Sequence, residues 1–108
     1  MENSPIHGQP GKLTDIVDYQ DGAIVSKTLV KGRRGSVTVF AFDQGQELSE
    51  HTVAFDALVY VFDGEADIRI SGALHRVRAG EVMVMPSNSP HAVKAVQRFK
   101  MMLSMIKG

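Results

Sequence analysis

Apolar and polar positions alternate along this chain in short segments, and no long segment repeats apolar residues every three or four positions. The apolar segments are rich in Val, Ile, Thr and Phe, and Gly, Asp, Ser or Pro bounds them, which is typical of β-strands joined by turns. Any helix is expected to be a single short turn. The regular spacing predicts an all-β sandwich or barrel. The predicted strands cover residues 24–30, 36–42, 57–62, 66–70, 75–78, 81–85, 91–96 and 99–106.

The first segment of the chain has a different character. Residues 1–12 combine prolines and glycines with few apolar side chains, so this segment buries too little surface to become ordered alone. We expect a flexible N-terminal arm over residues 1–12, which a partner subunit could order, and a single domain over residues 13–108. The chain of 108 residues has the size of one domain with one core.

Composition excludes several classes of function. Twelve acidic and twelve basic residues give a net charge of zero, so no overall field favours a nucleic acid or an anionic membrane. The apolar segments are shorter than the ~20 residues that span a membrane, and no leader pattern begins the chain, which leads us to expect a cytoplasmic protein. The absence of cysteine excludes disulfides, thiolate ligands and a cysteine nucleophile.

Two histidines lie in glycine-bounded patterns that carry the candidate chemistry. His51 follows Gly45 and precedes Gly64, and His91 follows Gly80 and Pro86. These two segments resemble the two motifs of the cupin superfamily, over roughly residues 36–106. The first cupin motif is Gly, five residues, His-x-His, three or four residues, Glu, six residues and Gly. The second is Gly, five residues, Pro-x-Gly, two residues and His. The positions that match are Gly45, His51, Gly64, Gly80, Pro86 and His91.

The resemblance implies a cupin double-stranded β-helix, an RmlC-like jelly-roll barrel, assembled as a homodimer. In metal-loaded cupins three histidines and one glutamate of these motifs hold a divalent ion. Here Val53 stands in place of the second His, Ala57 in place of the Glu, and Asn88 in place of the second-motif Gly. The resemblance therefore implies the fold together with an incomplete set of metal ligands.

Strand alternation predicts which side chains share the barrel interior. His51 and Val53 point the same way, His91 and Val93 form the facing wall, and Glu50 is sent outward unless a β-bulge intervenes. Asp56 is outward by the same count, and Gln46, His75 and Tyr60 are the other side chains that could complete a site, although Tyr60 shares the outward count. The expected ligand pocket consists of His51, Val53, Ala57, Val59, Met85, His91 and Val93.

Replacing a His and a Glu with Val and Ala makes the pocket more apolar and removes one negative charge. His51 and His91 are the candidate metal ligands, but two imidazoles hold Zn, Ni, Cu, Fe or Mn only with further donors from water, a ligand or other side chains. The sequence therefore assigns no certain cofactor and no catalytic residue.

Three hypotheses remain. In the first, which we favour, the barrel binds a small, partly apolar molecule that the two histidines orient. In the second, the protein is an enzyme: either a metal-dependent dioxygenase or isomerase, or a metal-free isomerase or epimerase with histidine acid–base chemistry. In the third, its own side chains fill the cavity and the role is structural. The methionines at 83, 85, 101, 102 and 105 are interpreted as core residues.

Overall fold

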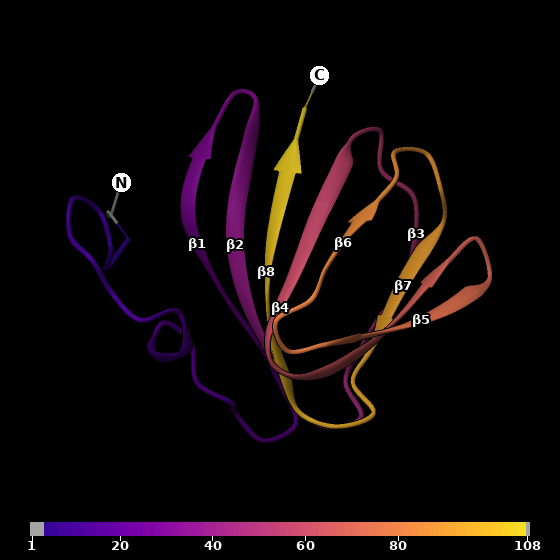
Figure 1. The fold of residues 1–108 in the computed structure, drawn as a ribbon, viewed down its shortest axis with the longest axis horizontal. Coiled ribbons are helices and arrows are strands. Elements are labelled where there is room, and N and C mark those ends of the chain that lie inside the picture. The colour runs from indigo at the N-terminus through magenta and orange to yellow at the C-terminus, as the bar shows by residue number, and fades with distance from the viewer. Residues whose placement is uncertain (1–3, 108) are drawn as a thin grey trace.

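The structure is a computed structural model and describes residues 4–107 (Figure 1). A single 3-10 turn precedes an all-β domain, in agreement with the prediction of one short helical turn. The elements are η1 (Leu13–Asp15), β1 (Ile24–Gly32), β2 (Gly35–Phe42), β3 (Glu47–His51), β4 (Asp56–Ile70), β5 (Ala73–Arg78), β6 (Val82–Met85), β7 (His91–Lys94) and β8 (Phe99–Ile106).

The strands pair antiparallel around β4, which belongs to both walls of the barrel. The first part of β4 pairs with β8 and β6, and β8 continues the wall through β2 to β1. The last part of β4 pairs with β5 and β7, and β7 continues the second wall to β3. Figure 1 shows the two walls curling toward each other, which confirms the predicted jelly-roll barrel. No helix among the described residues is long and apolar enough to cross a membrane.

The sequence prediction was wrong about a break at Asp63 and Gly64. β4 runs without interruption from Asp56 to Ile70, and it bends at Gly64, where φ is 71°. The register with β8 shifts between Val61 and Asp63, so a bulge accommodates the bend without ending the strand. A Cβ at Gly64 would collide with the carbonyl oxygen of Arg98. The glycine therefore permits a corner inside one strand instead of a turn between two.

β3 is the strand that the apolar pattern missed. Its sequence, Glu-Leu-Ser-Glu-His, is almost entirely polar, and it becomes a strand by pairing with β7. The other predicted strands are present, with ends that differ by a few residues. The turn glycines at 45, 64, 72 and 80 all have positive φ, as expected for positions that require glycine.

The main core fills the space between the two walls. Phe42 of β2 and Phe99 of β8 stack with ring centroids 4.5 Å apart and an interplanar angle of 16°. Both side chains are completely buried. Around them lie buried apolar residues from β4, β5, β6, β7, the connection after β7, and β8: Ala57, Val59, Val61, Ala66, Ile68, Val77, Met85, Val93, Ala95 and Met101.

A second, smaller core fastens the N-terminal segment to the outside of the barrel. Val17, which is 4% exposed, packs on Val39 and Ala41 of β2, with partly buried side chains of η1 and β1 around it. Of the predicted arm, residues 4–12 form turns and are mostly exposed, and residues 1–3 lie outside the described part of the chain. The segment from 13 onward is thus part of the folded domain.

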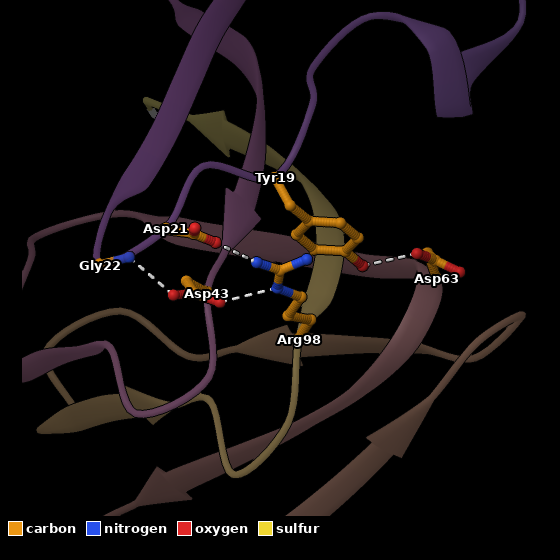
Figure 2. Close-up of polar contacts among 6 residues, drawn as sticks. All are labelled: Tyr19, Asp21, Gly22, Asp43, Asp63 and Arg98. Atoms are coloured by element: carbon orange, nitrogen blue, oxygen red, sulfur yellow. Dashed lines mark hydrogen bonds and ion pairs between the residues drawn. The ribbon is translucent and has the colours of Figure 1, made fainter.

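Arg98 joins this segment to the loop after β2 (Figure 2). Its guanidinium donates to the carboxylate of Asp43 at 2.7 Å and to that of Asp21 at 2.6 Å. The backbone N–H of Gly22 also donates to Asp43, at 2.6 Å. Because these contacts join residues far apart in the sequence, they hold the segment in one position against the barrel.

Tyr19 forms the other half of this polar network. Its hydroxyl donates to the carboxylate of Asp63 at 2.5 Å, and its ring lies 5.3 Å from the Arg98 guanidinium carbon. The Lys100 ammonium lies 5.0 Å from the same ring and donates to the Thr14 carbonyl at 2.9 Å. Burial, followed by the hydrogen bond to Asp63, raises the pKa of Tyr19 above its ordinary value. The hydroxyl therefore remains a donor at neutral pH.

Because of this network, we expect the stability that the N-terminal contacts contribute to be sensitive to acid. The hydrogen bond from Arg98, with that from Gly22, lowers the pKa of Asp43 from 3.8 to about 2. Since the folded pKa is the lower one, the stability that Asp43 contributes is complete above 3.8 and is lost as the pH falls toward 2. The free energy of unfolding, measured by urea denaturation across this window, should fall less steeply in Asp43→Asn than in wild type. Asp18→Asn, which removes an exposed carboxylate of the same segment, should retain the wild-type slope; equal slopes in wild type and Asp43→Asn would contradict the assignment.

Candidate functional site

A β-bulge in β3 brings His51 to the barrel interior. Leu48 pairs with Val93, so an undisturbed ladder would place Glu50 opposite His91. The register instead shifts by one residue between Leu48 and His51, and His51 pairs with His91. Because of the extra residue, the imidazole of His51 lies at the barrel mouth in place of the carboxylate of Glu50. A bulge was expected to turn Glu50 or Asp56 inward, whereas the bulge in β3 turns His51 inward and leaves Glu50 exposed.

The two imidazoles contact each other edge to face. Their Nε2 atoms are 3.1 Å apart, and the ring centroids are 4.3 Å apart at an interplanar angle of 70°. The Nδ1 atom of His51 lies 2.9 Å from the Ser49 carbonyl oxygen, to which it can donate. His91 is only 3% exposed, whereas His51 is exposed. The pair thus has one buried member and one that solvent reaches.

When both imidazoles are neutral, at least one ring nitrogen of the pair has no hydrogen-bond partner. Two neutral imidazoles carry two N–H groups, and His51 uses one of them on Ser49. If His91 donates from Nε2 to His51, its Nδ1 remains a buried acceptor without a hydrogen-bond partner. If His91 carries its proton on Nδ1 instead, two bare lone pairs face each other at 3.1 Å. In the first tautomer the free acceptor is the buried Nδ1 of His91, whereas in the second the two Nε2 atoms can together accept one more donor or a cation.

Burial lowers the pKa of His91, and the neighbouring His51 lowers it further, while the backbone of Ser89 acts weakly in the opposite direction. His91 is therefore neutral at neutral pH. Because the folded pKa of His91 lies below the ordinary 6.5, the stability that neutral His91 contributes is complete above that value and is lost as the pH falls below it. The site therefore favours the neutral form of His91.

The other members of the expected pocket lie mostly deeper than the histidines. Val53 lies between β3 and β4 and is partly exposed. The four remaining side chains are 0–3% exposed and belong to the main core. These four are Ala57, Val59, Met85 and Val93. A ligand that touched them would have to displace core packing.

Several inner side chains are only partly buried; Met83 and Met105 among them were predicted as core residues, whereas Leu48, Ile70 and Leu103 were not predicted. Leu48 and Ile70 flank the histidines, since Ile70 pairs with His91. On the other wall, residues of β6 and β8 pair with the buried positions of β4 and share their inward face: Met83, Leu103 and Met105. We call these five residues the inner rim. Counting alternation along β8 from the buried Phe99 would have placed Leu103 and Met105 inside the barrel.

The other side chains proposed to complete a site do not converge on the histidines. Glu50 is exposed, and Gln46 uses its backbone to pair with Ala95. The Asp56 carboxylate accepts the backbone N–H of Ser87 at 2.9 Å, so it fixes the loop before His91. His75 is exposed on β5. Within residues 4–107 no group of three or more His, Cys, Asp or Glu side chains is placed to hold a metal.

His51 and His91 fit a metal ion only in part. At the ~2.0–2.1 Å of a zinc–imidazole bond, two nitrogens 3.1 Å apart subtend an angle of about 100° at one ion, which is a normal angle between neighbouring ligands. The Ser49 carbonyl orients the His51 ring as a supporting contact does in metal sites. Val53 and Ala57 supply no third or fourth ligand. The site matches an open two-histidine site and does not match a complete cupin centre.

A groove of about 420 Å³ lies on the outer face of this wall, along β3, β7, β4 and β5. Its lining includes charged side chains of both signs, among them Glu47, Glu50 and Arg69. The groove and the histidine pair are on opposite sides of the same strands, so they are separate features.

Comparisons with known proteins agree with this geometry. The family model described as the cupin domain matches residues 38–106. A conserved protein of unknown function from Streptococcus pyogenes, SPY1581, is 37% identical over 98% of this chain and 93% of its own, with a TM-score of 0.93. A cupin 2 conserved barrel domain protein from Leptotrichia buccalis is 42% identical over 88% of this chain and 46% of its own, with a TM-score of 0.85.

A cupin superfamily protein from Desulfitobacterium hafniense, 24% identical, has the same fold with a TM-score of 0.90 over 99% of this chain and 97% of its own. The comparison with curated proteins found no match. The family match covers the strands that carry both histidines, and the similarity to the Streptococcus pyogenes protein covers nearly the whole chain. The chain therefore belongs to the cupin family.

Proposed function

We propose that this cupin binds a small, partly apolar molecule at the mouth of its barrel, through the His51–His91 pair and the inner rim. The observation that carries the proposal is the 3.1 Å contact between the two Nε2 atoms. Because one nitrogen of the neutral pair lacks a proton to share, the pair favours a ligand that brings a hydrogen-bond donor. The inner rim supplies apolar contacts for the rest of the ligand.

The position of the ligand follows from burial. His51 is exposed and His91 lies directly behind it, while the core side chains below are closed off. A ligand that binds at the mouth therefore displaces fewer core side chains than one that binds closer to Val59. The ligand class that fits is an apolar body with one hydroxyl or N–H group, for which phenol is a simple probe.

Phenol should shift the histidine ring signals in a nitrogen–proton NMR spectrum at millimolar concentration, whereas anisole, which lacks the donor, should bind at least about tenfold more weakly. His51→Ala should remove most of this difference, because the exposed acceptor is lost. His75→Ala is the matched control, since it removes an exposed histidine on β5. Equal binding of phenol and anisole, or unchanged binding by His51→Ala, would contradict the proposal.

A second candidate is a transition-metal site, favoured by the spacing and by the Ser49 contact. His51 and His91 would be its protein ligands, and the metal would supply Lewis-acid or redox chemistry when bound. Calorimetric titration with Cu²⁺, Ni²⁺ and Zn²⁺ tests it directly. Stoichiometric binding that His91→Ala abolishes, with the fold intact by circular dichroism, would favour the metal; binding that survives this substitution would exclude the pair as its ligands.

A further inference from the structure

Four basic side chains gather at one end of the barrel. Lys31 lies at the end of β1, Arg33 and Arg34 form the turn to β2, and Lys107 follows β8. All four are exposed. The backbone N–H of Lys107 donates to the Arg34 carbonyl at 2.7 Å, and the Lys107 ammonium lies 5.8 Å from the ring of Phe55, which precedes β4. We call these four basic residues the basic tip.

The basic tip is at the same end of the barrel as the mouth. Ile106 pairs with both Gly35 and Asp56, so the start of β2, the end of β8 and the start of β4 form one row across the wall. The loops after β3 and before β7 join the histidine pair to this row, and the Asn88 N–H of one donates to the Val53 carbonyl of the other at 2.7 Å. Figure 1 shows the β1–β2 turn, the C-terminal end and these loops at one end of the molecule.

The basic tip gives the mouth a positive charge, although the chain as a whole has none. Two carboxylates lie at this end, those of Glu50 and Asp56, and Asp56 already accepts the backbone N–H of Ser87. Within residues 4–107 no salt bridge involves the basic tip, because the ion pairs there use β5 and Arg98. An excess of exposed cations attracts anions over about 10 Å at an ionic strength of about 0.1 M.

Apolar side chains lie below the basic tip. Leu103 and Met105 of the inner rim belong to β8, the strand that ends at the tip, and Met105 pairs with Ser36 of β2. Since β8 lies between β2 and β4, only about 10 Å of wall separates the β1–β2 turn from the start of β4. A ligand on the inner rim is therefore within reach of the positive charge.

We propose that the molecule bound at the mouth is an amphiphilic organic carboxylate. Its hydrogen-bond donor meets the histidine pair, its apolar body lies on the inner rim, and its carboxylate faces the basic tip, whose guanidinium groups match carboxylate geometry. This inference rests on the proposed function and adds the charge of the ligand to it. A neutral histidine pair supplies no charge for an anion, so the basic tip is the part of the mouth that selects it.

Binding of para-hydroxyphenylpropionate and of its neutral amide tests the proposal. The two probes share the phenol hydroxyl and the ring, and they differ in charge. At about 10 mM salt the carboxylate should bind wild type at least about threefold more tightly than the amide. At about 1 M salt, where screening acts beyond ~3 Å, the difference should disappear. Shifts of the histidine ring signals in nitrogen–proton NMR spectra give both affinities.

Two double variants with the same loss of charge locate the effect. Arg33→Gln with Arg34→Gln should remove most of the preference for the carboxylate and leave the affinity for the amide unchanged. Lys12→Gln with Lys27→Gln is the control, because these exposed lysines precede η1 and lie inside β1, away from the turn. Circular dichroism checks the fold. If the first double variant does not fold, Arg33→Gln alone should still weaken binding of the carboxylate about twofold.

Equal affinity of wild type for the two probes, or an equal loss in both double variants, would overturn the proposal. The donor-selective mouth would then remain, provided that phenol still binds better than anisole. Failure of phenol and of both probes to bind would remove the proposed function together with this inference. A single-stranded oligonucleotide that binds through Arg33 and Arg34, with no preference for the carboxylate, would assign the basic tip to a polyanion instead.

Discussion

Phe42→Ala is expected to lower the free energy of unfolding by about 3–5 kcal/mol. The Phe42 side chain is completely buried, and its ring stacks on Phe99 at 4.5 Å, so truncation leaves a cavity between β2 and β8 and removes an aromatic contact. For a domain of this size the melting temperature should fall by about 12–25 °C. Urea denaturation followed by circular dichroism measures the midpoint concentration of urea and the slope of the free energy of unfolding against urea concentration.

Phe55→Ala provides the control for loss of an aromatic ring. Phe55 precedes β4, is partly exposed, and belongs to neither core, although its ring lies 5.8 Å from the Lys107 ammonium. Its replacement should cost less than about 1 kcal/mol. If Phe42→Ala proves too unstable to purify, Phe42→Leu should still cost about 1 kcal/mol or more. Equal losses in Phe42→Ala and Phe55→Ala would show that the stacked pair is not central to the core.

Gly64→Ala is expected to cost at least about 3 kcal/mol, although it adds a single methyl group. The φ of 71° is strained for any residue with a Cβ, and that Cβ would meet the carbonyl oxygen of Arg98 and the Phe99 backbone. Backbone cannot move aside as a flexible side chain can. Since β4 belongs to both walls, relief of the collision would separate β4 from β8 at the corner.

Gly72→Ala isolates the collision from the cost of positive φ. Gly72 has a φ of 86°, and an added Cβ would meet nothing within 4 Å. This substitution should cost only about 1 kcal/mol, the ordinary penalty of the conformation. The difference between the two variants in thermal or urea unfolding therefore measures the contact with Arg98. A difference close to zero would mean that the corner relaxes without cost.

The bulge in β3 connects the fold to the proposed binding site. Without the extra residue, Glu50 would face His91, and the mouth of the barrel would carry a carboxylate next to an imidazole. With the extra residue, two neutral imidazoles meet, and at least one of their nitrogens has no hydrogen-bond partner. The chemical character of the site, a neutral acceptor of donors or cations, therefore depends on one local irregularity of pairing.

Much of the architecture could be predicted from local pattern. Alternation and turn residues located all the strands except β3, and glycines 45, 64, 72 and 80 have the positive φ that was expected. The motif spacing located His51 and His91, and the structure brings their rings into contact. β3 escaped prediction because its residues are polar and its pairing partner, β7, lies about forty residues later in the chain. The continuity of β4 through Gly64 escaped because a glycine that bends a strand and one that ends it look alike in sequence.

By itself, the sequence determined the all-β class and most turn positions, because these follow from side-chain period and from backbone freedom at single residues, and its resemblance to the cupin motifs marked His51 and His91. Only the tertiary structure decided whether Glu50 or His51 faces His91 and how deeply Val59 and Met85 are buried. These features depend on register between distant strands, where a shift of one residue moves a side chain to the other face of the sheet.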